Sequence, residues 1–205
     1  MKSSVLYIHG KGGSAAESGH YKPLFPCSDV IGLDYQTFTP WETGKEIRAF
    51  VENMKSQYET IILIANSIGV FFCLNADIDS LIERAFFISP IVDMEKLIVS
   101  MMAAENITED ELRQRRVVRT SSGEDLSWEY LRYVRDHPVR WTAPTAVLCG
   151  RNDTLTSFET ITAFADKCDA KVTVMENGGH WFHSEEQMRF LDEWIIKNRI
   201  EEGEK

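Results

Sequence analysis

Six short apolar runs, separated by helix-compatible segments, constrain the fold of this 205-residue chain more than any other feature. Near-continuous runs of Val, Ile, Leu, Ala and Phe are typical of strands that are buried on both faces of a parallel sheet. Their alternation with helical patterns predicts an α/β fold with helices on both sides of the sheet. The predicted strands cover residues 5–8, 30–33, 61–64, 85–88, 146–148 and 172–175.

Helical periodicity fills the intervals between these strands. Helices are predicted over residues 42–54, 68–75, 157–167 and 184–198. The last of them carries Met188, Leu191, Trp194 and Ile195 at helical spacing, which indicates a face packed on the core.

One interval is much longer than a crossover requires, because about fifty residues separate Pro90 from Pro144, whereas a parallel connection needs only about a dozen. We expect one domain over residues 1–205, with residues 93–143 inserted as a helical lid after the fourth strand. Three helices are predicted within the insertion. The first covers residues 94–104, the second begins at the capping-box pattern of residues 108–111, and the third covers residues 127–135.

The charge and composition of the chain make several classes of function less favourable. The formal net charge of −10 disfavours binding to nucleic acid or to anionic membrane surfaces. The first apolar run is too short for a signal-peptide core, so the expected location is the cytoplasm. The four cysteines are irregularly spaced, without CxxC or nearby histidines at metal-ligand intervals, so no metal site is predicted.

The segment from Ala65 to Gly69 has the pattern of a nucleophile elbow, in which a serine between small residues sits on a tight strand-to-helix turn. Such a turn lifts the hydroxyl of Ser67 clear of the sheet. It also leaves the backbone N–H of Ile68 at a helix N-terminus, where negative charge is stabilised. A helix-capping serine is the alternative interpretation of the same pattern.

A serine nucleophile needs a base and a group that orients the base. Gly178-Gly179-His180 follows the last predicted strand, and Gly150-Arg151-Asn152-Asp153 follows the strand before it. Both segments leave the carboxyl ends of strands, where functional residues of open parallel sheets gather. The order Ser67, Asp153, His180 is the one expected of an α/β-hydrolase.

The chain resembles the α/β-hydrolase superfamily, particularly its small bacterial esterase-like members. The resemblance rests on the segment Tyr7 to Gly13, the elbow, the segment Gly150 to Asp153, and Gly179-His180. It implies a trimmed six-stranded sheet, because the chain begins at what resembles the family's third strand. It implies Ser67 as nucleophile, His180 as general acid and base, and Asp153 as the carboxylate that sets the histidine tautomer. It also implies oxyanion N–H groups on Lys11 and Ile68.

These inferences together predict a serine hydrolase that cleaves a small carboxylic ester without a metal or organic cofactor. A thioester or small amide would use the same groups, and a non-catalytic binding protein that retains the fold is the alternative from a different class. Met101, Trp128 and Tyr133 of the insertion are candidate substrate contacts. Their helical spacing is equally typical of packing.

Two residues are alternatives for the roles of base and acid, and a third is expected to support the oxyanion loop. His183 could replace His180 as the base, although no Gly-Gly precedes it. Asp93 follows the fourth strand and is an alternative acid, although a helix-capping role is common for such a carboxylate. His9 is expected to brace the oxyanion loop with its ring.

Overall fold

The computed structural model describes residues 2–200. It divides into two compact units: unit 1 holds residues 2–92 and 140–200, and unit 2 is Asp93–Val139. The elements of unit 1 are, in chain order, β1 (Ser3–Ile8), η1 (Ala15–Leu24), β2 (Ser28–Leu33), α1 (Pro40–Lys55), β3 (Thr60–Asn66), α2 (Ile68–Leu74), η2 (Asp79–Leu81), β4 (Arg84–Ile88), β7 (Thr145–Gly150), α6 (Phe158–Cys168), β8 (Lys171–Met175) and α7 (Glu185–Ile200).

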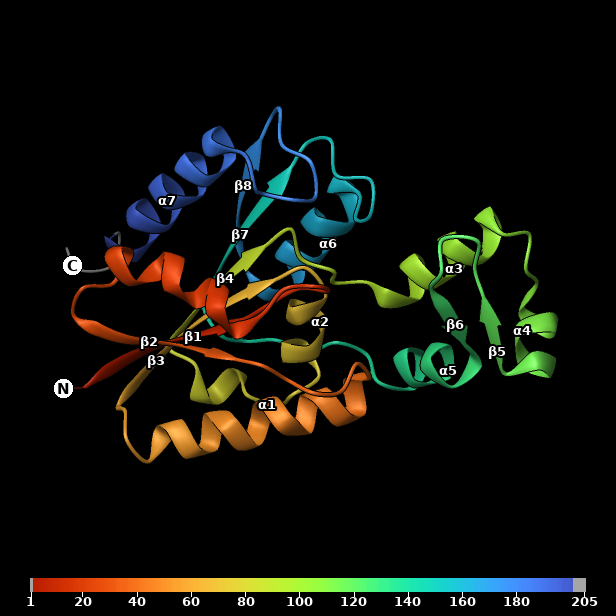
Figure 1. The fold of residues 1–205 in the computed structure, drawn as a ribbon, viewed down its shortest axis with the longest axis horizontal. Helices are drawn as coiled ribbons and strands as arrows, with labels where there is room; N and C mark the ends of the chain where they lie inside the picture. The colour runs from red at the N-terminus through yellow and green to blue at the C-terminus, as the bar shows by residue number, and fades with distance from the viewer. Residues whose placement is uncertain (1, 201–205) are drawn as a thin grey trace. The chain divides into compact units, whose positions relative to one another are not determined.

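Unit 1 is built on a six-stranded sheet in the order β2-β1-β3-β4-β7-β8, in which all neighbouring strands are parallel (Figure 1). The predicted α/β class and six-stranded parallel sheet are therefore confirmed. Because the strands are parallel, the loops that follow β1, β3, β4, β7 and β8 all leave from the same edge of the sheet.

The core lies on both faces of this sheet, as successive residues of β4 demonstrate. Phe86 packs edge-on against Trp194 of α7, with ring centroids 5.5 Å apart. The next residue, Phe87, packs against Phe164 of α6 at 6.4 Å. Figure 1 shows α7 and α1 on opposite sides of the sheet. Both phenylalanines are fully buried, which explains why the strands read as continuous apolar runs rather than alternating ones.

Unit 2 contains three helices and a two-stranded antiparallel hairpin. Each helix begins with a side-chain cap: Asp93 accepts a hydrogen bond from the amide of Lys96 at 2.9 Å, and Thr108 and Ser127 cap the next two helices in the same way. The capping pattern at 108–111 thus predicted a real helix start. The elements are α3 (Met94–Ala104), α4 (Glu109–Arg115), β5 (Val117–Arg119), β6 (Asp125–Ser127) and α5 (Trp128–Asp136).

Three features were absent from the sequence prediction: η1, the three-residue η2, and the hairpin of β5 and β6. The ten-residue 3₁₀ segment η1 includes Gly19 and Pro23, which obscure any helical period. The strands β5 and β6 have three residues each, too few for an alternating pattern to stand out.

Arg135 joins the three helices of unit 2. Its guanidinium donates two hydrogen bonds to Glu109 of α4, at 2.8 and 2.9 Å, and one to Glu95 of α3 at 2.7 Å. The Arg135 hydrogen bond holds the pKa of Glu109 below its ordinary value. A lowered folded-state pKa contributes stability that is complete above the unfolded pKa of about 4.3 and is lost as the pH falls below it.

We expect Arg135→Ala to loosen unit 2, so that limited proteolysis cuts residues 93–139 several-fold faster than in the wild type. The difference should shrink in acid, because Glu109 is then protonated and the wild type loses the same contact. Arg119→Ala is the matched control, since Arg119 makes a single exposed pair with Asp125 at 3.1 Å and its removal should change little. Equal cleavage of both variants and the wild type at neutral pH would contradict the assignment.

None of the helices within residues 2–200 combines the length and the apolar character that a membrane span requires.

Candidate active site

Ser67 lies on the turn between β3 and α2 in a backbone conformation that few non-glycine residues adopt, with φ 53° and ψ −121°. Such a conformation costs about 1–3 kcal/mol and persists only where neighbours hold it. Here the Ser67 amide donates to the carbonyl of Ile88 at 3.0 Å. Its own carbonyl accepts from the amides of Val70 and Ile91, at 3.1 and 3.2 Å. Bonds on both sides therefore hold the strained turn in place.

The loop after β1 lies directly against this turn. A Cβ atom added to Gly69 would lie 2.4 Å from the carbonyl oxygen of His9, closer than real Cβ contacts allow. A Cβ on Gly10 would lie 3.2 Å from the Cβ of Ser67. The small residue two positions after the serine is thus required by the close approach of another backbone segment.

A chain of two hydrogen bonds joins the serine to an imidazole and a carboxylate. The Oγ of Ser67 lies 2.8 Å from Nε2 of His180, and Nδ1 of His180 lies 2.8 Å from Oδ2 of Asp153. The side chains of His180 and Asp153 are 19% and 3% exposed. A carboxylate can only accept, so Nδ1 carries the proton and Nε2 is left to accept the hydroxyl proton of Ser67.

The loops that carry the acid and the histidine are tied to each other. A Cβ on Gly150 would lie 2.3 Å from the carbonyl oxygen of Gly178, and that oxygen accepts a hydrogen bond from the amide of Asn152 at 2.9 Å. The other carboxylate oxygen of Asp153, Oδ1, accepts hydrogen bonds from the amides of Leu155 and Thr156, at 2.8 and 3.1 Å. The loop of Asp153 therefore orients its carboxylate independently of the hydrogen bond to His180.

A tight turn follows β1. The amide of Gly13 donates to the carbonyl of Gly10 at 3.2 Å, and Gly12 has a φ of 76°, as the third residue of a type II turn requires. Nδ1 of His9 lies 2.7 Å from the same Gly10 carbonyl, and the His9 ring stacks on Tyr35 at 4.2 Å. This geometry matches the bracing expected of His9. We call residues 10–13 the oxyanion turn, after the role that the sequence analysis predicts for Lys11.

The two candidate oxyanion donors lie on the segments described above. Lys11 is the second residue of the oxyanion turn. Ile68 is the first residue of α2, so its amide is among those that have no acceptor within the helix. The contact of Gly10 with Ser67 brings the two segments together.

No protein-family model matches the chain. A segment of 82 residues is 32% identical to the protein named "Putative esterase/lipase 3" of Mycoplasma genitalium, and the match spans 35% of this chain and only 29% of that protein. Among solved structures, Est1E from Butyrivibrio proteoclasticus superposes with a TM-score of 0.80 at 17% identity, over 98% of this chain and 88% of Est1E. The chain has the α/β-hydrolase fold. Alpha/beta hydrolase domain-containing protein 10 from mouse gives a TM-score of 0.76 at 18% identity, over 97% of this chain and 89% of that one.

The α/β-hydrolase fold orders its site residues as serine, acid and histidine along the chain. Ser67 after β3, Asp153 after β7 and His180 after β8 follow that order and meet at the carboxyl edge of the sheet. The order of these residues along the chain and their hydrogen bonds in the structure thus involve the same three side chains.

The competing residues make other contacts. The Nδ1 of His183 lies 3.0 Å from the carbonyl of Trp181, on an exposed segment. Asp93 caps α3 through its hydrogen bond with Lys96, in unit 2. Neither takes part in the hydrogen-bond chain that ends at Ser67.

Cys149 lies close to Asp153 at the end of β7, and its thiol is not suited to act as a nucleophile. Burial first, and then the charge of Asp153, raises the pKa of Cys149 to about 11, so the thiol is protonated near neutral pH. Within residues 2–200 no group of three His, Cys, Asp or Glu side chains is arranged to hold a metal ion.

Met101 lies on α3, and Trp128 and Tyr133 lie on α5, all in unit 2. Their contact with substrate stays a prediction from the sequence, as does the role of this unit as a lid.

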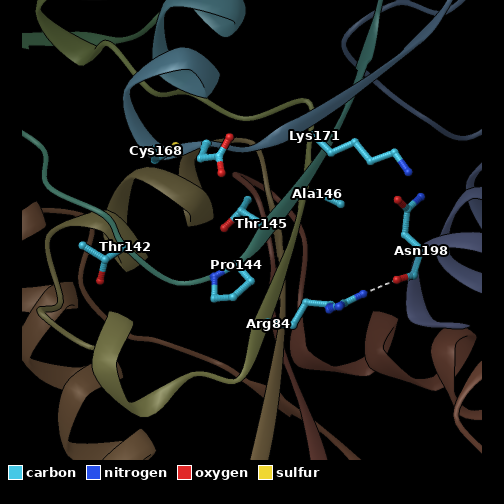
Figure 2. A pocket seen from close by; sticks show the side chains of 9 residues that line it. Arg84, Thr142, Pro144, Thr145, Ala146, Cys168, Lys171 and Asn198 are labelled. Atoms are coloured by element: carbon cyan, nitrogen blue, oxygen red, sulfur yellow. Dashed lines mark hydrogen bonds between the residues drawn. The ribbon is translucent and has the colours of Figure 1, made fainter. Parts of the chain in front are cut away.

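A cavity of about 340 Å³ in unit 1 lies at the edge of the sheet opposite to Ser67, Asp153 and His180 (Figure 2). Its lining includes Arg84, Thr145 and Lys171, which begin β4, β7 and β8, together with Asn198 near the end of α7. In Figure 2 the guanidinium of Arg84 donates to the carbonyl of Asn198. Because the hydroxyl, imidazole and carboxylate meet at the carboxyl edge, this cavity is no part of that site.

Sequence reasoning missed the contacts that support the turn after β1. The apolar run and the motif that contain Tyr7 give no sign that its hydroxyl donates to Glu17 at 2.5 Å. The spacing of Ser14 and Glu17 has the capping-box form, and the amide of Ser14 does donate to the Glu17 carboxylate at 3.3 Å. That spacing is the sequence signal that could have drawn attention to Glu17.

Proposed function

We propose that the protein is a serine hydrolase that cleaves a small carboxylic ester through an acyl-enzyme intermediate. The observation that carries the proposal is the pair of 2.8 Å contacts from Ser67 through His180 to Asp153. The α/β-hydrolase fold and the named esterase relatives support the broader assignment to the hydrolases. The strained elbow adds to this support, because strain is retained at sites where it positions a reacting group.

In the proposed first step, His180 Nε2 takes the proton of Ser67 as its Oγ bonds to the substrate carbonyl carbon. The carbonyl π electrons move to the oxygen, which the backbone N–H groups of Lys11 and Ile68 stabilise. Asp153 holds the imidazolium through Nδ1–H and does not itself take up the proton.

The tetrahedral intermediate then expels the alkoxide. His180 gives its Nε2 proton to the leaving oxygen, and the acyl group stays on Ser67 Oγ. Water attacks the acyl carbon while His180 removes its proton, and a second tetrahedral intermediate releases the carboxylic acid and restores the serine hydroxyl.

A fluorophosphonate probe tests the proposal, because it forms a stable bond only with an activated serine. We expect wild type to gain the mass of one probe less HF, because the bond from Ser67 Oγ to phosphorus forms as fluoride leaves, and peptide mapping should locate the label at Ser67. Ser67→Ala and His180→Ala should not react.

Ester, thioester and amide panels would then distinguish the leaving group. Well-folded wild type that resists small probes of varied acyl structure would favour a binding protein that retains the fold, whereas labelling at a residue other than Ser67 would contradict the assignment of Ser67 as the nucleophile.

A further inference from the structure

A buried tyrosine and a carboxylate, neither of which takes part in the proposed chemistry, lie next to the oxyanion turn. Tyr7 lies on β1 and is 2% exposed, and its hydroxyl donates to Oε2 of Glu17 at 2.5 Å. The other oxygen of Glu17 accepts the amide of Ser14 at 3.3 Å. Ser14 is the residue directly after the turn.

Glu17 also lies against the backbone of the turn. A Cβ on Gly13 would lie 2.7 and 3.0 Å from the two carboxylate oxygens of Glu17, and 3.0 Å from the Cβ of His9. The carboxylate of Glu17 and the Cβ of His9 therefore both occupy the space beside Gly13. A turn of this kind has little freedom to move while both contacts remain.

The same tyrosine reaches the nucleophile elbow. The side chain of Asn66, the residue before Ser67, hydrogen-bonds to Tyr7. The Nδ2 atom of Asn66 also lies 3.7 Å from the position that a Cβ on Gly10 would take. Burial first, and then the neighbouring Tyr21 and Glu17, raises the pKa of Tyr7, so its hydroxyl keeps the proton that it donates.

We propose that Tyr7 and Glu17 are positioning residues that hold the oxyanion turn in register with the elbow, and so align the N–H of Lys11 with that of Ile68. This inference rests on the proposed function, since the turn matters for catalysis only if an oxyanion forms there. The connection runs from Asn66 through Tyr7 and Glu17 to Ser14, and thus spans the turn from one side to the other.

Loss of this support should reduce kcat by about 10- to 100-fold, a fraction of the effect of removing one oxyanion donor. KM for a small ester should change by no more than about twofold, because the donors act on charge that develops only in the transition state. A boronic acid that forms a tetrahedral adduct with Ser67 should lose affinity in parallel with kcat.

The experiment compares Tyr7→Phe, Glu17→Gln and Glu17→Ala with the wild type. Glu17→Gln keeps the shape and one carbonyl oxygen, so it should retain more activity than Glu17→Ala. The matched control is Tyr58→Phe, which removes a similar bond, from a buried tyrosine to Asp29 at 2.8 Å, near the start of β2 and β3. It should leave kcat unchanged.

Amide hydrogen exchange over residues 10–14 is measured on the same proteins, because it reports the turn directly and needs no substrate. Faster exchange in Tyr7→Phe and Glu17→Ala, but not in Tyr58→Phe, supports the positioning role of the pair. Unchanged exchange would overturn it, whether or not the wild type hydrolyses esters. Normal kcat in the Tyr7 and Glu17 variants of an active enzyme would also overturn it, whereas an inactive wild type with the expected exchange pattern contradicts only the proposed hydrolase function.

Discussion

Ser67→Ala and His180→Ala each lower kcat/KM for a small activated ester by about 10⁴- to 10⁶-fold, and the double variant is no slower than either single one. The reason is that the two side chains act as one unit across their 2.8 Å contact. Without the imidazole the hydroxyl is a weak nucleophile, and without the hydroxyl the imidazole has no proton to remove. Stopped or continuous assays on purified single and double variants measure the coupling.

Matched controls separate this effect from loss of folding. Ser56→Ala removes a hydroxyl that donates to the carbonyl of Asn53 at the end of α1, and His183→Ala removes an exposed imidazole three residues after His180. Both should retain kcat/KM within about twofold, as surface substitutions away from a site usually do. If His183→Ala were as inactive as His180→Ala, the base would have been assigned to the wrong histidine. Additive losses in the double variant would contradict a shared role.

Asp153→Asn lowers kcat by about 10⁴-fold while the protein stays folded. Asparagine keeps one side-chain oxygen, which can still accept the amides of Leu155 and Thr156, so the loop should hold its shape. Its amide nitrogen would face Nδ1 of His180 as a donor, which forces the imidazole proton onto Nε2. That tautomer cannot accept the proton of Ser67.

The control for this prediction is Asp93→Asn, at the alternative acid. Asparagine caps helices about as well as aspartate, so α3 should be unaffected and kcat should be preserved. Nitrogen NMR of His180 in both variants and the wild type would identify the tautomer. Full activity in Asp153→Asn, with the Nδ1-protonated tautomer retained, would remove Asp153 from the proposed mechanism.

The sheet could be predicted closely from the sequence because its signal is local. Each strand that is buried on both faces must be apolar at nearly every position, as Phe86 and Phe87 illustrate by packing on opposite layers. The predicted strand at 85–88 and the observed Arg84–Ile88 differ by one residue for that reason. Short or irregular elements lack such a signal, which is why η1 and the β5–β6 hairpin were missed.

The candidate site could be predicted in part. Ser67, Asp153 and His180 each follow a recognisable strand, and parallel strands end at one edge, so their proximity follows from topology. The hydrogen bonds between them do not follow from the topology. The contact of His180 with Asp153 depends on two loops that touch at Gly150 and Gly178, and no rule of local spacing requires that contact.

The sequence by itself determined the class of fold, the order of the strands that carry the site, and the three residue types that meet there. It could do so because burial and turn geometry leave local patterns of apolar residues, glycines and a serine. Only the tertiary structure decided that Ser67 adopts a strained φ of 53°, that Gly69 is required by the His9 carbonyl, and that Tyr7 joins the elbow to the turn. These contacts join segments far apart in the chain, and their energies depend on distances of a few tenths of an ångström, which packing of the whole unit sets.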